Sequence, residues 1–304
     1  MRSRKIGLAT GLNYHLLEWN GDQPKPQQFD HTVILLHGFL DLSWSWAEVA
    51  PVLAEHFHVI APDMRGHGDS DRVGSGGYYH FVDYLADLHE VIAQTARARL
   101  SLVGHSMGGA IAAYYTGSFP QKINKLALLE GVGVPESLPG PEKIVTWLDS
   151  WNAARERKNK EYESLGEAAV RLCERDPLCP KPTALELAKH ATTILPNGKL
   201  AFKHDPVHLS TGPFGFEVEV AARFWQRITC PTLLIEGAVS PFRFAKDEMA
   251  RRYAHFHHRQ EWVIEHAGHM MMRHQPKKLA EGLVQFLLDP DDPAAEKARR
   301  VAAA

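Results

Sequence analysis

Residues 100–109 read LSLVGHSMGG, a short apolar run followed by a serine between glycines. The apolar run predicts a buried strand, and the small residues 108–116 predict a helix. A strand that turns this sharply into a helix needs glycines beside the serine, because the serine backbone must adopt a strained conformation. Such a turn lifts Ser106 clear of the sheet at the start of a helix. The segment therefore predicts an α/β fold with an exposed candidate nucleophile.

Short apolar runs alternate with amphipathic stretches along most of the chain. The runs predicted as strands are residues 11–19, 32–37, 58–61, 100–103, 125–129, 232–235 and 261–264. Apolar positions at helical spacing and small-residue runs predict helices over residues 78–96, 108–116 and 277–288. This alternation is typical of a mostly parallel central sheet with helices on both faces. We therefore expect an α/β fold class.

Residues 131–227 interrupt the alternation. They open with a Pro- and Gly-rich run and continue in charged segments that predict helices near residues 151–173 and 183–193. We expect a core from residues 1–134 and 228–290, a helical cap over 135–227, and a disordered tail over 291–304. Ligand crevices of open α/β sheets lie at the carboxyl ends of the strands, so the cap is expected to cover such a crevice.

Composition excludes several classes of partner. The chain has 34 basic and 36 acidic residues, a formal charge of −2, so no basic field favours nucleic acid or an anionic membrane. No apolar run approaches the roughly 20 residues that span a bilayer, and the N-terminus has no apolar signal segment. Three cysteines without metal or redox spacing indicate no disulfide framework, which favours the cytoplasm.

Three further motifs follow predicted strands in chain order. They are residues 37–39 (HGF), residues 62–70 (PDMRGHGDS) and residues 266–269 (HAGH). Together with the serine turn, these motifs resemble the α/β-hydrolase fold superfamily, and within it the serine-nucleophile hydrolase or esterase branch with an inserted helical cap. The resemblance covers nearly the whole chain apart from the cap.

The resemblance implies a nucleophile and a base. Ser106 would be the nucleophile, and a serine hydroxyl needs a neutral imidazole within hydrogen-bond reach to attack. His269 fits this role by its position after the final strand. His266 and His274 are its rivals, but the Gly-His pair at the end of the turn favours His269.

The resemblance also implies an oxyanion hole. Negative charge on the carbonyl oxygen of a tetrahedral intermediate requires preorganised amide donors, here the backbone N–H groups of Phe39 and Met107. Their side chains would shape the pocket without supplying those bonds. Aromatic residues of the expected cap are apolar enough to face a ligand, namely Trp147, Trp151, Phe214, Phe216, Phe224 and Trp225.

The third member of the triad departs from the family pattern. Relatives carry an aspartate after the strand that corresponds to residues 232–237, whereas this chain has Ser240. Three explanations remain open: Glu130 after the preceding strand supplies the carboxylate, Glu236 or Asp247 supplies it, or there is no acid. We favour Glu130, because it directly follows four apolar residues of a predicted central strand, and because some relatives, including certain haloalkane dehalogenases, place their acid after that strand. The order serine, acid, histidine is kept.

These residues predict a serine hydrolase, carboxylesterase-like, that cleaves a carboxylic ester or related acyl compound through an acyl-serine intermediate. The expected partner is a small-molecule acyl substrate, and neither a metal nor an organic cofactor is needed. Two alternatives remain: a non-catalytic small-molecule binding protein on a hydrolase scaffold, and a serine-dependent carbon–carbon bond hydrolase. Oligomeric state and substrate identity are left open.

Overall fold

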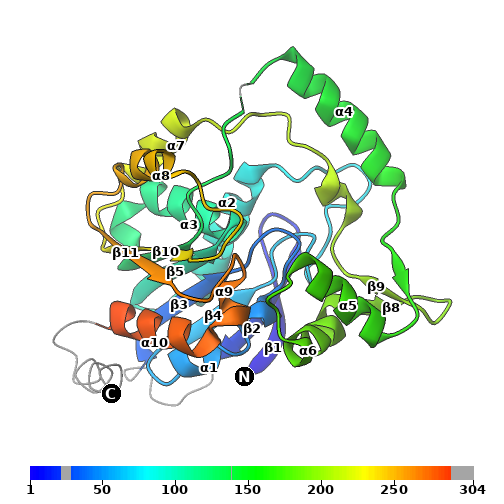
Figure 1. Cartoon of the computed structure of the whole chain (residues 1–304), viewed down its shortest axis with the longest axis horizontal. Helices are drawn as coiled ribbons and strands as arrows, with labels where there is room; N and C mark the ends of the chain where they lie inside the picture. Colours follow the sequence, from blue (N-terminus) through cyan, green and yellow to red (C-terminus); the bar gives the residue numbers. More distant parts are fainter. Residues whose placement is uncertain (22–28, 138, 289–304) are drawn as a thin grey trace.

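The computed structural model describes residues 1–21, 29–137 and 139–288, so the tail expected at residues 291–304 lies outside the described part. Eight strands form one sheet in the order β1-β2-β4-β3-β5-β6-β10-β11 (Figure 1). Their bounds are Arg2–Gly7 (β1), Asn13–Trp19 (β2), His31–Leu36 (β3), His58–Pro62 (β4), Arg99–His105 (β5), Lys125–Leu129 (β6), Thr232–Gly237 (β10) and Arg259–Ile264 (β11).

The sheet is mostly parallel. β1 and β2 form an antiparallel hairpin and β2 pairs antiparallel with β4, whereas every pair from β4 to β11 is parallel. All seven predicted strands are present, each within two residues of its expected ends. β1 was missed because its sequence, RSRKIG, is largely polar and exposed. The predicted α/β fold class is confirmed.

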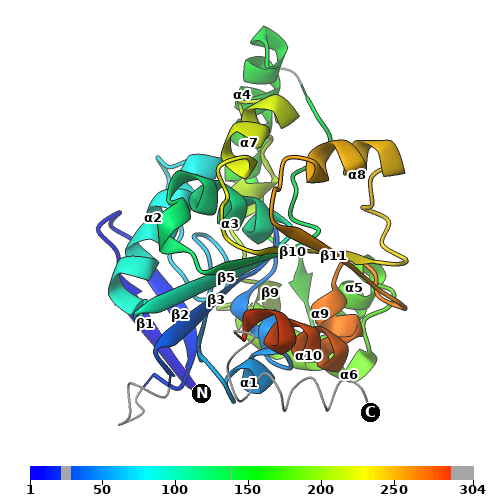
Figure 2. The same ribbon diagram turned by 90° about the vertical axis from the view of Figure 1, so that its left-hand side faces the viewer.

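Helices cover both faces of this sheet (Figure 2). One face carries α2 (Phe81–Thr95), α3 (Met107–Ser118), α7 (Val218–Trp225) and α8 (Lys246–Tyr253), and the other carries α1 (Ala50–Leu53), α9 (Met271–His274) and α10 (Pro276–Leu287). Two apolar clusters fill the layers, because successive strand residues point to opposite faces. On β3, Ile34 and Leu36 pack under α2 and α3, while Val33 and Leu35 pack under α1 and α10.

The segment inserted between β6 and α7, which we call the cap, combines helices with a small sheet. Its helices are α4 (Pro141–Glu156), α5 (Leu165–Arg175), α6 (Lys181–Ala191) and the 3-10 helix η4 (Pro206–Leu209), and its antiparallel sheet is β7 (Glu161–Tyr162), β9 (Leu200–Phe202) and β8 (Thr192–Ile194). The 3-10 helices η2 (Ser43–Trp46) and η3 (Pro120–Lys122) belong to the core. The three short strands were not expected from the sequence.

A polar turn interrupts the single helical segment expected over residues 151–173. α4 ends at Glu156, and β7 intervenes before α5 begins at Leu165. Asn159 in this turn donates hydrogen bonds to the carbonyl oxygens of Phe202 and His204, at 2.7 and 2.6 Å. These bonds tie the turn to the region of β9, a tertiary contact that helical periodicity does not reveal.

α7 lies inside the residue range expected for the cap but packs on the core. Its residues Val218, Ala221, Ala222 and Trp225 are buried in the same apolar cluster as α3. Gly117 of α3 allows this approach, since a side chain there would collide with the backbone of Phe224. We therefore propose that the cap ends before α7.

Candidate active site

Ser106 lies in a strained turn between β5 and α3. Its backbone has φ 51° and ψ −116°, a region that non-glycine residues rarely adopt. The Ser106 N–H donates to the carbonyl oxygen of Leu129 at 2.9 Å and so ties the turn to β6. A side chain at Gly104 would collide with the backbone of Gly108 and Gly109. The turn therefore has the form that the sequence predicts, and close packing explains the glycine at 104.

The loop after β3 lies against the serine turn. A side-chain Cβ at Gly38 would come within 3.3 Å of the Ser106 Cβ, so the two segments approach closely. Met107 is the first residue of α3, and a helix leaves its first N–H groups without partners inside the helix. Within the described residues, the N–H groups of Phe39 and Met107 donate no hydrogen bond. Both remain available to a ligand.

Two buried histidines hold this loop in place. His37 donates from Nδ1 to the carbonyl oxygen of Gly38 at 2.7 Å and accepts the Met64 N–H at Nε2, at 2.9 Å. His67 accepts the Leu40 N–H at Nε2, at 3.2 Å, and its Nδ1 donates to a backbone carbonyl. Burial lowers the pKa of His67 well below its usual value. The neutral form of His67 is therefore the one that can accept from the loop.

His269 lies beside the serine turn. His105, the residue before Ser106, donates from Nε2 to the His269 carbonyl oxygen at 2.9 Å, and the two rings lie 4.5 Å apart. Its rival His266 is exposed. The other rival, His274, accepts a backbone N–H of the same loop and donates to Asp176 of the cap at 2.7 Å. His274 is thus occupied in holding the loop.

Glu130 is the carboxylate that contacts His269. Its Oε2 lies 2.5 Å from His269 Nδ1. The same oxygen accepts the Ser240 hydroxyl at 2.8 Å, and Oε1 accepts the Gly237 N–H at 3.0 Å. Burial raises the pKa of this carboxyl, but the hydrogen bonds from His269, Gly237 and Ser240 outweigh burial and lower the pKa below its usual value. Glu130 is therefore held as a carboxylate.

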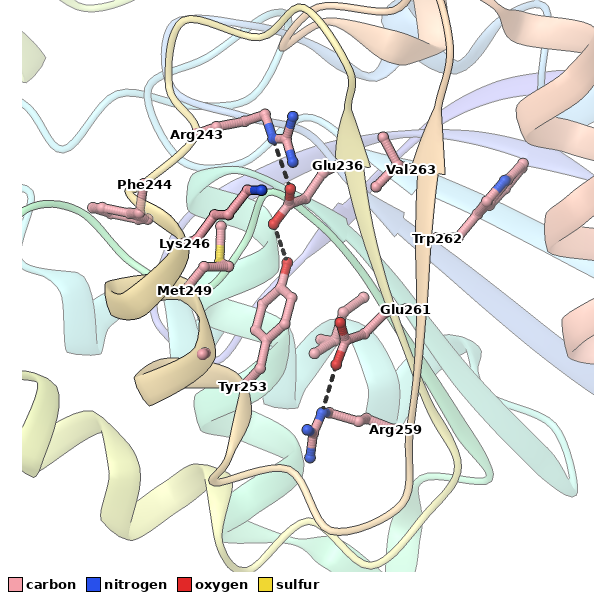
Figure 3. Close-up of a pocket in the computed structure, with 12 residues that line it drawn as sticks. Glu236, Arg243, Phe244, Lys246, Met249, Tyr253, Arg259, Glu261, Trp262 and Val263 are labelled. Carbon is pink, nitrogen blue, oxygen red and sulfur yellow. Dashed lines mark hydrogen bonds and ion pairs between the residues drawn. The ribbon is translucent and has the colours of Figure 1, made fainter.

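The two other candidate acids lie elsewhere. Glu236 accepts hydrogen bonds from Arg243 and Tyr253, each at 2.8 Å, in a separate cavity of about 270 Å³ beside α8 and β11 (Figure 3). Asp247 lies on α8 and is exposed. Neither contacts His269, so the structure favours Glu130 among the three alternatives of the sequence.

The nucleophile and the histidine are neighbours without a direct bond. Among the described residues, the Ser106 hydroxyl makes no hydrogen bond to His269. Such bonds are often long without substrate and tighten in the substrate complex. Since Nδ1 of His269 is occupied by Glu130, the free Nε2 is the atom that could accept the serine proton.

Two cavities flank Phe39 where the cap meets the core. One, of about 240 Å³, is lined by Phe39, Met107 and rings of the cap, including Trp147 and Trp151. The other, of about 310 Å³, is lined by Phe39, Leu40, the cap residue Arg175 and Met270, the residue after His269. A ligand can therefore lie on either side of the Phe39 backbone.

Of the six cap aromatics named from the sequence, only Trp147 and Trp151 line these cavities. Phe214 is 75% exposed, and Phe224 stacks on Tyr114. The remaining two are Trp225, buried in the core, and Phe216, which packs against Gly133 and Arg252.

Sequence reasoning missed three residues that support the site. Ser240 was read only as a lost acid, although its hydroxyl holds Glu130. His105 and Asp176 were not singled out, and they fix the His269 loop from the serine turn and from the cap. His105 stands inside the serine motif and could have been suspected. Asp176 had no signal, because its partner His274 lies far along the chain.

The fold and this arrangement define a class. A mostly parallel sheet carries a serine on a strained strand–helix turn, a histidine after the last strand and a carboxylate after an intermediate strand. These features are those of α/β hydrolases.

Sequence comparison agrees. A family model described as alpha/beta hydrolase fold matches residues 31–272, and the chain belongs to this family. A serine hydrolase-like protein of Dictyostelium discoideum is 23% identical over 94% of this chain and 82% of its own length. A serine hydrolase-like protein of Danio rerio is 32% identical over 43% of this chain and 42% of its own length.

Solved structures share the fold. The thioesterase domain from the curacin biosynthetic pathway has a TM-score of 0.79 at 24% identity, over 94% of this chain and 99% of that domain. An esterase of M. tuberculosis has a TM-score of 0.72 at 20% identity, over 94% and 91% of the two chains. No helix in the described part of the chain is long and apolar enough to cross a membrane.

Proposed function

We propose that this α/β hydrolase is a serine hydrolase that cleaves a carboxylic ester or related acyl compound. Ser106 is the nucleophile, His269 the base and Glu130 the acid of the triad. The observation that carries the proposal is the 2.5 Å contact between His269 Nδ1 and Glu130 Oε2 beside the strained serine turn. Through this contact, Glu130 supplies the carboxylate that the family usually carries at the position of Ser240.

The proposed reaction has two halves. His269 Nε2 takes the Ser106 proton while the serine oxygen attacks the carbonyl carbon, and the Phe39 and Met107 N–H groups stabilise the oxyanion. The intermediate collapses as the imidazolium gives its proton to the leaving-group oxygen, which leaves an acyl-serine. Water, deprotonated by His269, then attacks the acyl carbon. Collapse of this second intermediate returns the proton to Ser106 and releases the acid.

Glu130 acts through the imidazole. Its hydrogen bond to Nδ1 selects the tautomer with a free Nε2, and its negative charge stabilises the imidazolium. This contact weakens the alternative of a non-catalytic binding protein, which rested on the missing aspartate. A carbon–carbon bond hydrolase would use the same residues and is separated from the ester hydrolase by its substrates.

Ser106→Ala tests the proposal. We expect loss of labelling by a fluorophosphonate probe and a fall in ester turnover of about 10⁵–10⁶-fold, as removal of a triad serine causes elsewhere. Ser118→Ala is the matched control, since Ser118 is exposed and, among the described residues, its hydroxyl bonds only the Tyr114 carbonyl in its own helix. Full labelling of Ser106→Ala in a folded protein would refute the assignment.

The reducing cytoplasm is the location we propose for the enzyme. Cys173, Cys179 and Cys230 are all free, and the last two are buried, as expected of a chain that does not depend on disulfides. Localisation of a fluorescently tagged chain in its native cell would test this.

A further inference from the structure

The two cavities beside Phe39 differ in chemistry. None of the described residues that line the cavity of about 240 Å³ is Asp, Glu, Lys or Arg. The cavity of about 310 Å³ contains four such residues, Asp41, Arg175, Asp176 and Arg273. An ester has an acyl end and a leaving-group end. The contrast between the two cavities indicates that these ends of the substrate differ in polarity.

The position of His269 indicates which end of the ester lies in which cavity. In the proposed mechanism the imidazolium protonates the leaving group, so the leaving group lies on the histidine side of the reacting carbonyl. The charged cavity is lined by Met270 and Arg273, which follow His269, whereas no residue of that loop lines the uncharged cavity. Met107, a proposed oxyanion donor, lines the uncharged cavity. The acyl group therefore belongs in the uncharged cavity.

The walls of the acyl cavity are rings. Tyr78 stacks on Trp151 with centroids 5.1 Å apart and planes at 30°, and Trp147 lies 5.3 Å from the same tyrosine. Phe81 and Tyr84 complete this wall on the core side. Aromatic pairs gain energy beyond the area that they bury, so a wall of rings favours contact with another flat ring.

Three polar side chains of this cavity are already engaged with the protein, whereas the buried Trp151 Nε1 has no partner among the described residues. Thr211 bonds the Ser150 hydroxyl at 3.0 Å, and Ser210 donates to a backbone carbonyl at 2.7 Å. Tyr79 donates to Asp205 at 2.7 Å. A ligand therefore meets mainly ring faces and edges. A cavity of about 150 Å³ admits benzene, so about 240 Å³ has room for a ring and a short linker.

We propose that the acyl group of the substrate is aromatic, an arylalkanoyl or similar flat ring on a short linker. It packs against the wall formed by Tyr78, Trp147 and Trp151, and the polar leaving group lies beside Arg175. This proposal rests on the serine hydrolase function proposed above and names the substrate class of that site.

The test compares three para-nitrophenyl esters with acyl groups of equal carbon number: phenylacetate, cyclohexylacetate and octanoate. The leaving group is constant, so differences in kcat/KM report the acyl group. We expect phenylacetate to exceed cyclohexylacetate by about tenfold, the value of a good aromatic contact. Equal or faster turnover of the two saturated esters would overturn the inference.

Two variants attribute the preference to the cavity. Tyr78→Leu keeps an apolar side chain but removes the central ring, and should reduce the preference for phenylacetate to threefold or less. Phe214→Leu makes the same kind of change at an exposed ring that does not line the cavity, and should leave the preference intact. An unchanged preference in Tyr78→Leu would also overturn the inference.

Binding separates this inference from the function on which it rests. The Ser106→Ala variant should bind the para-nitrophenyl ester of phenylacetate more tightly than that of cyclohexylacetate. Quenching of tryptophan fluorescence can report this binding, because Trp147 and Trp151 line the cavity. If the wild type reacts with the fluorophosphonate probe but shows no aromatic preference, only the inference fails. If it neither reacts with the probe nor hydrolyses any of the esters, the proposed function fails.

Discussion

Glu130, the residue that we propose as the triad acid, comes from a different part of the chain than the usual aspartate. It follows β6 with φ 47°, a conformation that non-glycine residues adopt rarely, and its N–H donates to the Ile235 carbonyl at 2.9 Å. Its side chain thereby reaches the place between His269 and Ser240. The positions after β6 and after β10 converge on one point, because the two strands are parallel neighbours.

We predict that Glu130→Gln lowers kcat by about 10²–10⁴-fold, because the amide removes the charge that stabilises the imidazolium. Adding Ser240→Asp in that background should recover at least tenfold, since Ser240 Oγ lies 2.8 Å from the oxygen that bonds His269. Ester kinetics of the single and double variants measure both effects.

Ser240→Asp alone is the control for this exchange. It brings a second carboxylate beside Glu130 and should impair the enzyme through like-charge repulsion. A double variant no better than Glu130→Gln would contradict the convergence of the two positions.

At the level of elements, the loop between β10 and α8 connects the edge of the sheet to the site. Arg243 donates to Glu236 of β10 at 2.8 Å (Figure 3). It also donates to the Ala238 carbonyl at 3.4 Å, so it ties the loop to the end of β10. Just before Arg243 in the same loop, Ser240 bonds Glu130, and the ring of Phe242 lies 4.5 Å from that of His269. Arg243 is therefore a positioning residue for the proposed triad.

Arg243→Gln should lower kcat about tenfold and change KM little, since the loop loses a hydrogen-bonded support while the two cavities beside Phe39 keep their lining. Steady-state kinetics on one ester, with thermal unfolding to verify the fold, measure this. Lys246→Gln is the control, because Lys246 lines the same cavity as Arg243 but has no hydrogen bond or ion pair among the described residues. A rise in KM of about tenfold in place of the fall in kcat would indicate that Arg243 has a role in substrate binding instead.

At the scale of the whole molecule, buried histidines lie where the cap meets the core. His208 of η4 bonds Tyr84 and the Arg65 carbonyl, and its ring lies 4.1 Å from that of His67. Burial is the main cause that lowers the pKa of His208 to about 3, with His204 adding to it and Asp205 opposing it. Burial likewise lowers the pKa of His204 to about 4. The junction is therefore built from neutral imidazoles.

Acid should loosen this junction. Between pH 6.5 and about 3 the unfolded chain binds a proton at His208 that the folded chain does not, so stability is present above pH 6.5 and falls as the pH decreases. At 1.36 kcal/mol per pKa unit, the loss from His208 between pH 6.5 and 5 is about 2 kcal/mol. Urea unfolding at these two pH values measures it.

His208→Phe should reduce that pH dependence, because phenylalanine keeps a ring at the junction and cannot take up a proton. His255→Phe is the control, since His255 lies on the core surface, where it bonds Gln226 at 2.9 Å. The same pH slope in the wild type and in His208→Phe would contradict the assignment of the acid sensitivity to this histidine.

The sequence by itself determined the central sheet, the serine turn and the order of the site residues. Local chemistry controls these features: apolar runs predict buried strands, and a serine between glycines predicts a strained turn. Even the relocated acid could be proposed, because Glu130 directly follows a central strand.

Only the tertiary structure decided the contacts that depend on distant segments. The choice of Glu130 over Glu236 depends on their contacts, because Glu130 contacts His269 whereas Glu236 accepts from Tyr253. Packing between the cap and the core sets three further features. They are the support of the His269 loop by Asp176, the small sheet of the cap, and the aromatic wall of the cavity of about 240 Å³. Side chains brought together across such long separations leave no periodic pattern in the sequence, because their spacing is set by the fold.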